Sequence, residues 1–176
     1  NRPCRHDPDD LAFLQIAAQR AADELLRANA EERLRVSEAG MRFALESAEL
    51  GLHEWDLDRG VSRYNERWAA MRGYGAREEV PDHLHSDRRL HPDDVARVEP
   101  HLAALRRGEI DTFRAELRTR TKSGDWRWLD AHATVLERHA DGSPKRVVSL
   151  QRDIHERRLA EQELREKQQW LQLVLD

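Results

Sequence analysis

The sequence predicts an α+β protein in which one compact domain lies between two helical segments. Residues 9–39 contain neither Gly nor Pro and repeat apolar residues at helical spacing. From residue 113 onward, apolar and polar residues alternate and short turn sequences separate the stretches, which is typical of neighbouring antiparallel strands. After Asp153, apolar residues again recur at helical spacing. We therefore divide the chain into an N-terminal helical segment at 1–39, a domain at 40–155 and a C-terminal helical segment at 156–176.

The composition agrees with this division. The chain has 176 residues, and 36% of them are charged, compared with roughly 25% in an ordinary globular domain. Exposed helices can hold that excess, while 39% hydrophobic residues suffice for one core. The net charge of −4 gives no reason to expect nucleic acid or an anionic membrane as a partner.

The cysteine content and the apolar runs exclude further classes. Cys4 is the only cysteine, which excludes a disulfide framework and a thiolate zinc centre. No stretch approaches the roughly 18 apolar residues of a membrane span, so we expect no direct membrane contact. The first residues include neither an initiator Met nor a signal-peptide core. We interpret the chain as a piece of a longer, soluble or cytoplasm-facing protein, and a membrane anchor elsewhere in the parent stays open.

Both helical segments carry a heptad-like seam. In the first, apolar residues alternate in steps of three and four. They are Leu11, Leu14, Ala18, Ala21, Leu25 and Ala28. Leu164 and Leu171 continue a seam in the last segment, and we predict a homodimer through the flanking helices. A plain amphipathic linker helix is an alternative for the first segment, and "LAFLQIAAQRAADELLRAN" also resembles the closing helix of a GAF domain.

Breaker and turn residues outline the first half of the domain. Gly40 is expected to end the first helix and residues 41–50 to form a short second one. Two short strands at 51–58 and 61–65 are joined by a turn at 58–60, which contains Gly60.

Capping signals and alternation outline the second half. Asn65 can cap a helix that ends at Gly73 or Gly75. A longer helix begins at Pro92 and ends before Gly108, and Pro100 should kink or split it. Three strands joined by short turns then close the domain. In the first of them, a core face alternates with a wet face: Phe113, Ala115 and Leu117 against Arg114, Glu116 and Arg118.

Several motifs, in order, carry a family resemblance. They are "RFALESAELGLHEWDLDRG", "YNERWAAMRGYG", "LHPDD" and "TKSGDWRWLDAHATVLERHADGSPKRVVSLQRDIHERRLAEQEL". Together they resemble a PAS domain of the fold-3 subfamily over about two thirds of the chain. The resemblance implies a five-stranded antiparallel sheet, helices on one face and a pocket between them. It also implies a downstream output domain in the same chain, most often a histidine kinase or a diguanylate cyclase.

The end of the last strand is the expected signal-coupling site. The family pattern there is Asp-Ile-Thr, and this chain has Asp153, Ile154 and His155. Asp153 matches the pattern and, beside a basic partner, would fix the exit angle of the outgoing helix. His155 replaces a residue that caps helices well, so the coupling is expected to be looser. A surface Asp near a helix start is the alternative interpretation.

The pocket prediction rests on large apolar side chains. The candidate lining residues are Trp55, Trp68, Leu102, Phe113 and Trp128. Tryptophan suits either a core or a ligand site, so packing of these rings against a core or a flanking helix stays open. We predict no cofactor, while a small-molecule ligand is compatible with such a pocket.

Haem and flavin are the alternatives for that pocket. A flavin–thiol adduct is excluded, because Cys4 lies outside the domain. Among relatives an axial His lies on the long helix, and His101 is there, although at a different spacing from the one expected. His83, His85 and His91 cluster around a polar loop, where imidazoles are usually solvated, and no metal site is predicted.

Three functional hypotheses follow. The first is a sensor that relays a conformational signal from its pocket to the outgoing helix. The second is a ligand-free dimerisation and relay module whose pocket is filled by tryptophans. The third is an enzyme fragment with His155 as phosphoacceptor, which lacks the proline that normally follows. We favour the first, with no catalytic residues in this chain.

Overall fold

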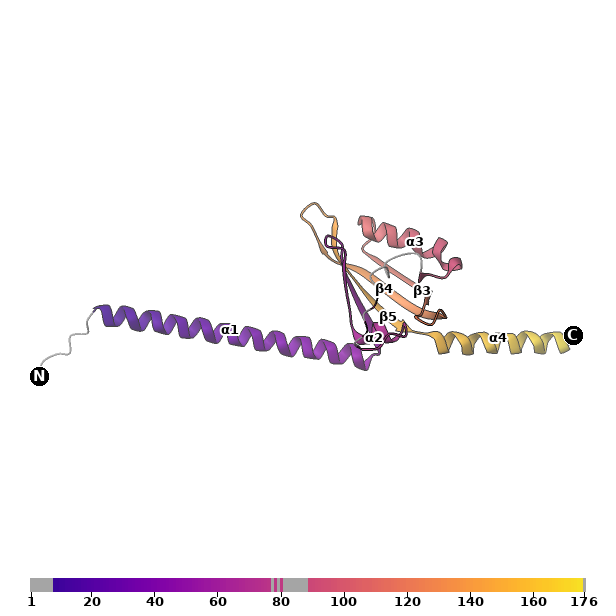
Figure 1. Ribbon diagram of the computed structural model, residues 1–176, viewed down its shortest axis with the longest axis horizontal. Coiled ribbons are helices and arrows are strands. Elements are labelled where there is room, and N and C mark those ends of the chain that lie inside the picture. The colour runs from indigo at the N-terminus through magenta and orange to yellow at the C-terminus, as the bar shows by residue number, and fades with distance from the viewer. Residues whose placement is uncertain (1–7, 77, 79, 81–88, 176) are drawn as a thin grey trace, which may run out of the picture. The chain divides into compact units, whose positions relative to one another are not determined.

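The computed structural model describes residues 8–76, 78, 80 and 89–175, with side chains from Gln15 to Val174 apart from the same gaps. The chain divides into two units, Asn1–Ala44 and Leu45–Asp176. The elements in chain order are α1 (Pro8–Ser47), β1 (Leu50–Asp56), β2 (Val61–Tyr64), α2 (Glu66–Ala70), α3 (Pro92–Arg107), β3 (Thr112–Arg120), β4 (Trp126–Arg138), β5 (Pro144–Asp153) and α4 (His155–Leu175) (Figure 1).

Helix α1 differs from the sequence prediction at Gly40. We expected the first helix to end there and a second one to cover 41–50, but α1 continues without a break to Ser47. An interior glycine costs a helix only about 1 kcal/mol, and the strong helix formers on both sides offset that cost. The helix ends shortly before Glu49, whose φ of 52° lies in the left-handed region.

The five strands form one antiparallel sheet in the order β2-β1-β5-β4-β3. The predicted meander of the last three strands is confirmed, and so is the five-stranded sheet that the resemblance implied. The last strand, β5, lies at the centre, where it pairs with β1 on one side and β4 on the other. β5 therefore contacts both halves of the sheet and leads directly into α4.

The predicted caps at Asn65 and Gly108 are confirmed, whereas α2 ends at Ala70 and not at the predicted Gly73 or Gly75. The side chain of Asn65 accepts a hydrogen bond from the amide of Trp68 at 3.0 Å and another from the amide of Leu52 at 2.9 Å, which ties α2 to β1. Gly108 ends α3 with a φ of 75°. Pro100 does not split α3. The buried side chains of Val98 and Leu105 hold the helix on either side of the proline, and each contributes about 2 kcal/mol of burial.

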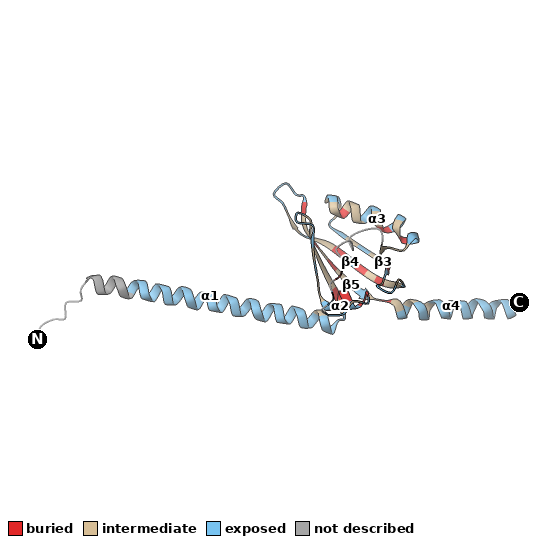
Figure 2. Ribbon diagram, viewed as in Figure 1, coloured by how far each residue is buried: buried red, intermediate tan, exposed pale blue. Residues whose placement is uncertain are grey.

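The core lies between one face of the sheet, hereafter the inner face, and helices α2 and α3. Leu117 and Leu129 on the sheet pack with Val98 of α3 and Met71 after α2. Figure 2 shows this buried layer in the domain and contrasts it with α1, where every described side chain from Gln15 to Ala44 is exposed. The opposite, outer face carries charged side chains such as Arg114 and Arg152.

Candidate functional site

A cavity of about 160 Å³ lies within the domain, between the inner face of the sheet, α3 and the turn after α2. One part of its wall is apolar and comes from Leu102, Leu105, Phe113, Leu117, Ala131, Ala133 and Val147. A cavity of about 150 Å³ is known to hold benzene, so this one has room for about a single ring.

Four of the five residues that we predicted for a pocket line this cavity: Trp55, Trp68, Leu102 and Phe113. Trp128 does not, and the prediction is wrong for that residue. It alternates with Leu129, which is fully buried on the inner face, so Trp128 lies on the outer face. There its ring lies 4.9 Å from the guanidinium of Arg118 and 4.7 Å from that of Arg158 in α4.

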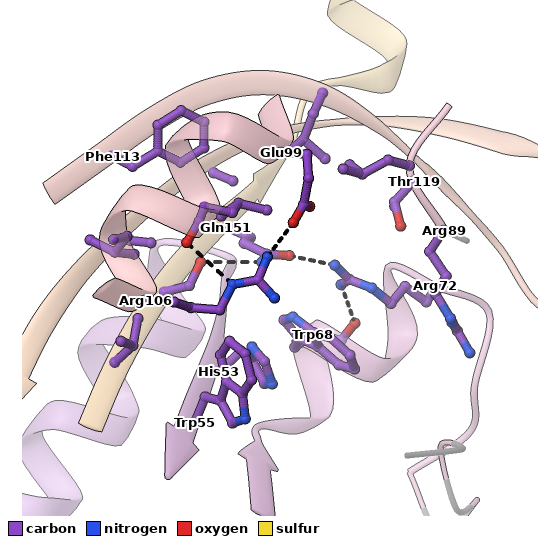
Figure 3. A pocket seen from close by; sticks show the side chains of 18 residues that line it. His53, Trp55, Trp68, Arg72, Arg89, Glu99, Arg106, Phe113, Thr119 and Gln151 are labelled. Carbon is purple, nitrogen blue, oxygen red and sulfur yellow. Dashed lines mark hydrogen bonds and ion pairs between the residues drawn. The ribbon is translucent and has the colours of Figure 1, made fainter. Parts of the chain in front are cut away.

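Arg72 is the most unusual residue of the cavity wall. It is 5% exposed, and its guanidinium lies 3.7 Å from the centre of the Trp68 ring. It donates to the carbonyl of Trp68 at 3.1 Å and to Oε1 of Gln151 at 2.6 Å (Figure 3). Burial, and then the positive charge of Arg89, lower the pKa of Arg72 to about 9. The guanidinium therefore still carries its charge at neutral pH.

Two more arginines complete the polar part of the wall. Arg106 of α3 pairs with Glu99 at 2.5 Å and lies 5.5 Å from the ring of Trp55. Arg89 donates to the hydroxyl of Tyr74 at 3.2 Å. Figure 3 shows Arg72 and Arg106 extending toward each other from the turn after α2 and from α3.

None of these arginines was predicted from the sequence. No local signal marks Arg72, because 36% of the chain is charged and charges also follow short apolar runs at exposed positions such as Arg107.

The end of β5 forms a tight junction with α4. One carboxylate oxygen of Asp153 accepts from Arg127 at 2.6 Å, and the other accepts from the amide of His155 at 2.9 Å, which caps the helix. Ile154 is 5% exposed, and its amide donates to the carbonyl of Trp128 at 3.1 Å. All three residues of the predicted coupling site thus take part in the connection between sheet and helix.

The first turn of α4 is also held to the outer face of the sheet. Glu116 accepts from Arg157 at 2.6 Å and lies 3.2 Å from Arg158. Among the described residues, Nδ1 of the half-buried His155 has no hydrogen-bond partner. These contacts orient α4 relative to β3 and β4.

The histidines considered as ligands have other surroundings. His101 is exposed, stacks on Phe113 at 5.2 Å and does not line the cavity. His91 caps α3, with Nδ1 accepting from the amide of Asp93 at 3.2 Å. His83 and His85 lie outside the described residues. The described part of the cavity, about 160 Å³, corresponds to about one ring.

The predicted seam residues are exposed where their side chains are described. Leu25 is 71% exposed, Leu164 is 58% and Leu171 is 50%, and Ala18 is exposed as well. The side chains of Leu11 and Leu14 lie outside those that the structure describes. Within the described part of the chain, no helix is long and apolar enough to cross a membrane.

Helices over one face of an antiparallel sheet, a cavity between them and a helix leaving from the central strand define a small α+β domain of the kind that encloses a pocket. The family model described as the PAS fold matches residues 61–151, more than half of the chain. The chain therefore belongs to the PAS family.

Relatives place similar domains in signalling proteins. The chain is 27% identical over 150 residues to the two-component sensor PprA of Pseudomonas aeruginosa, covering 83% of this chain and 16% of that protein. A solved sensory box histidine kinase/response regulator structure from Burkholderia thailandensis is 32% identical, with a TM-score of 0.62, covering 75% of this chain and 97% of that one.

A more distant structure agrees on the fold alone. It is the N-terminal domain of a diguanylate cyclase with PAS/PAC sensor from Marinobacter aquaeolei, 17% identical, with a TM-score of 0.50 over 62% of this chain and 98% of that one.

Proposed function

We propose that this chain is a signal-relay module, in which a change at the cavity alters the angle or register of α4 and thereby the activity of an output domain. The observation that carries the proposal is the double role of Asp153, which pairs with Arg127 on the sheet and caps α4 at His155. The helix start cannot reorient without changing one of these two bonds.

A short path joins the cavity to that junction. Gln151 lines the cavity and accepts from Arg72, and it lies two residues before Asp153 on the same face of β5. A group that binds beside Arg72 would compete for this hydrogen bond and change the end of β5. Neighbouring packing arrangements of a helix differ little in energy, so a small bias is enough to select between them.

The output is proposed to be a histidine kinase or a diguanylate cyclase. Supporting this, the relatives include a two-component sensor, a sensory box histidine kinase and a diguanylate cyclase. This chain spans only 16% of the first of these, so the catalytic step belongs to other parts of such proteins and this chain is proposed to be regulatory. Kinases and cyclases consume nucleoside triphosphates, which supports a cytoplasmic location.

The substitution Asp153→Ala tests the relay. Loss of a helix cap costs about 1 kcal/mol, so hydrogen–deuterium exchange at the amides of His155, which Asp153 binds, and of Arg158, which closes the first turn, should accelerate about fivefold. Asp111→Ala is the matched control, because Asp111 pairs with Arg138 at the other end of the sheet. Unchanged exchange in α4 of the Asp153 variant, or an equal acceleration in the control, would contradict the proposal.

Dimerisation through the flanking helices is part of the proposed mechanism. The observation favouring it is the set of large apolar side chains left exposed on both helices, such as Leu25, Leu164 and Leu171. Pairing of such seams buries them and lets a rotation at α4 reach the output as a change in coiled-coil register. In the ligand-free version of this function, the flanking helices alone supply the signal.

A further inference from the structure

We propose that the cavity binds a small carboxylic acid with an apolar body, the carboxylate lying against Arg72 and the body against the apolar wall. This inference rests on the proposed sensor function only in assuming that the cavity is an input site. It goes further by naming the chemical class of the input and the residue that recognises it.

The charges around the cavity are unbalanced in favour of an anion. Its described wall contains Arg72, Arg89 and Arg106, against the single carboxylate of Glu99. That carboxylate already pairs with Arg106. Among the described residues, Arg72 donates only to neutral acceptors, although it is almost completely removed from water. A buried cation without a counter-ion is costly, and a bound anion would remove much of that cost.

A second, independent observation points to an acceptor-bearing ligand. Nε1 of Trp68 is buried and has no hydrogen-bond partner within the described part of the chain. Trp68 lines the cavity and stacks directly beneath the guanidinium of Arg72. A buried N–H that makes no bond costs about 1–3 kcal/mol, so Trp68 offers a donor without an acceptor beside the cation of Arg72, whose described acceptors are neutral.

The size and the rest of the wall select the kind of anion. Inorganic phosphate or a small dicarboxylate has no apolar group that could contact the apolar part of the wall, which includes Leu102, Phe113 and Val147. The volume of about 160 Å³ admits about one ring or a short chain. Benzoate meets both requirements, and benzamide is its neutral isostere.

The test is a pair of titrations of the whole 176-residue chain, followed by ¹H–¹⁵N NMR and tryptophan fluorescence. A ligand this small is expected to bind with about millimolar to sub-millimolar affinity, well short of the ceiling for its size. Benzoate is expected to shift the amides around Arg72 and Gln151 and the side-chain Nε resonance of Arg72. It should bind about tenfold or more tightly than benzamide, as expected for charge-assisted hydrogen bonds.

Arg72→Met should abolish this preference, because methionine keeps the apolar volume and removes the charge. Arg114→Met is the matched control, since Arg114 lies on the outer face and pairs with Asp130 there. The control should keep the preference for benzoate. Should Arg72→Met fail to fold, Trp68→Phe keeps an aromatic ring at this position, removes the unpaired N–H and should weaken benzoate more than benzamide, because a hydrogen bond to a charged acceptor is the stronger one.

Equal binding of benzoate and benzamide, no shifts at millimolar benzoate, or phosphate binding as tightly as benzoate would overturn the inference. Failure of the relay gives a different pattern. If benzoate binds with the expected preference but leaves the exchange of the His155 and Arg158 amides unchanged, the ligand class stands and the relay fails. If Asp153→Ala loosens α4 while benzoate does not bind, the relay stands and the ligand class is wrong.

Discussion

At the scale of single residues, two charged side chains are buried among the described residues of the domain, and their partners differ. Asp94 is 4% exposed and fully compensated: it accepts from the amide and Nε of Arg118 at 2.8 and 3.0 Å and from Arg97 at 3.2 Å. Arg72 is buried to a similar degree, yet its described partners are neutral. Asp94 therefore serves stability by joining α3 to β3, whereas Arg72 is the residue to examine for binding.

Asp94→Asn should destabilise the domain at neutral pH by about 2 kcal/mol, since it removes the charge from a buried, paired position. Chemical denaturation measures this difference. Asp93→Asn is the control: Asp93 is the neighbouring carboxylate, also contacts Arg118, and is 71% exposed. Its loss should change the free energy of unfolding by less than about 1 kcal/mol. Equal effects of the two substitutions would show that the burial of Asp94 does not matter.

The same carboxylate predicts a pH dependence. Burial acts to raise the pKa of Asp94, but hydrogen bonds and ion pairs from Arg118 and Arg97 outweigh it and lower the pKa. A carboxyl with a lowered pKa in the folded state stabilises the fold above its unfolded pKa of about 3.9, and this contribution is lost as the pH falls through the folded value. The difference in unfolding free energy between wild type and Asp94→Asn should therefore be constant near pH 7 and shrink below about pH 4.

At the scale of elements, helix α1 and the domain differ in what stabilises them. In α1 the described side chains make few contacts, so helix propensity and i,i+4 pairs such as Arg27–Glu31 are the local sources of its stability. In the domain, tertiary packing overrides propensity, as at Pro100, which α3 tolerates because Val98 and Leu105 are buried on the sheet.

Two glycine substitutions should show that contrast. A Cβ at Gly40 would meet nothing within 4 Å, so Gly40→Ala should stabilise α1 by about 1 kcal/mol and slow amide exchange around it. A Cβ at Gly51 would lie 3.0 Å from the backbone Cα of Trp68, so Gly51→Ala should destabilise the domain by about 1–3 kcal/mol. Circular dichroism and thermal melts of both variants check this. A stabilising Gly51→Ala would mean that α2 packs less closely on β1 than described.

At the scale of the whole molecule, the exposed seams predict self-association. The double substitution Leu164→Glu and Leu171→Glu places charges on the seam of α4 and should convert a dimer to a monomer at micromolar concentration, measured by analytical ultracentrifugation. Gln162→Glu with Gln169→Glu adds the same charge on another side of the helix and should leave the association intact. A wild-type chain that is monomeric at all accessible concentrations would contradict the prediction.

Much of the fold could be predicted from the sequence because its signals are local. The Asn65 cap, the Gly108 stop and the alternation along residues 113–118 each depend on neighbours a few positions away. The error at Gly40 has a local cause too, since one glycine weakens a helix without ending it. Four of the five predicted pocket residues line the cavity for the general reason that large apolar side chains gather on the inner face.

The sequence by itself determined the strands, the helices α2 and α3, their order, the family and the position of the junction at Asp153. Only the tertiary structure decided that Trp128 lies on the outer face, and only it brought Arg72 into contact with Gln151, 79 residues further along the chain. The physical reason is that the role of a charged side chain depends on its burial and on its partners. Both are set by strand register and helix packing between residues far apart in the sequence, so the local sequence does not contain them.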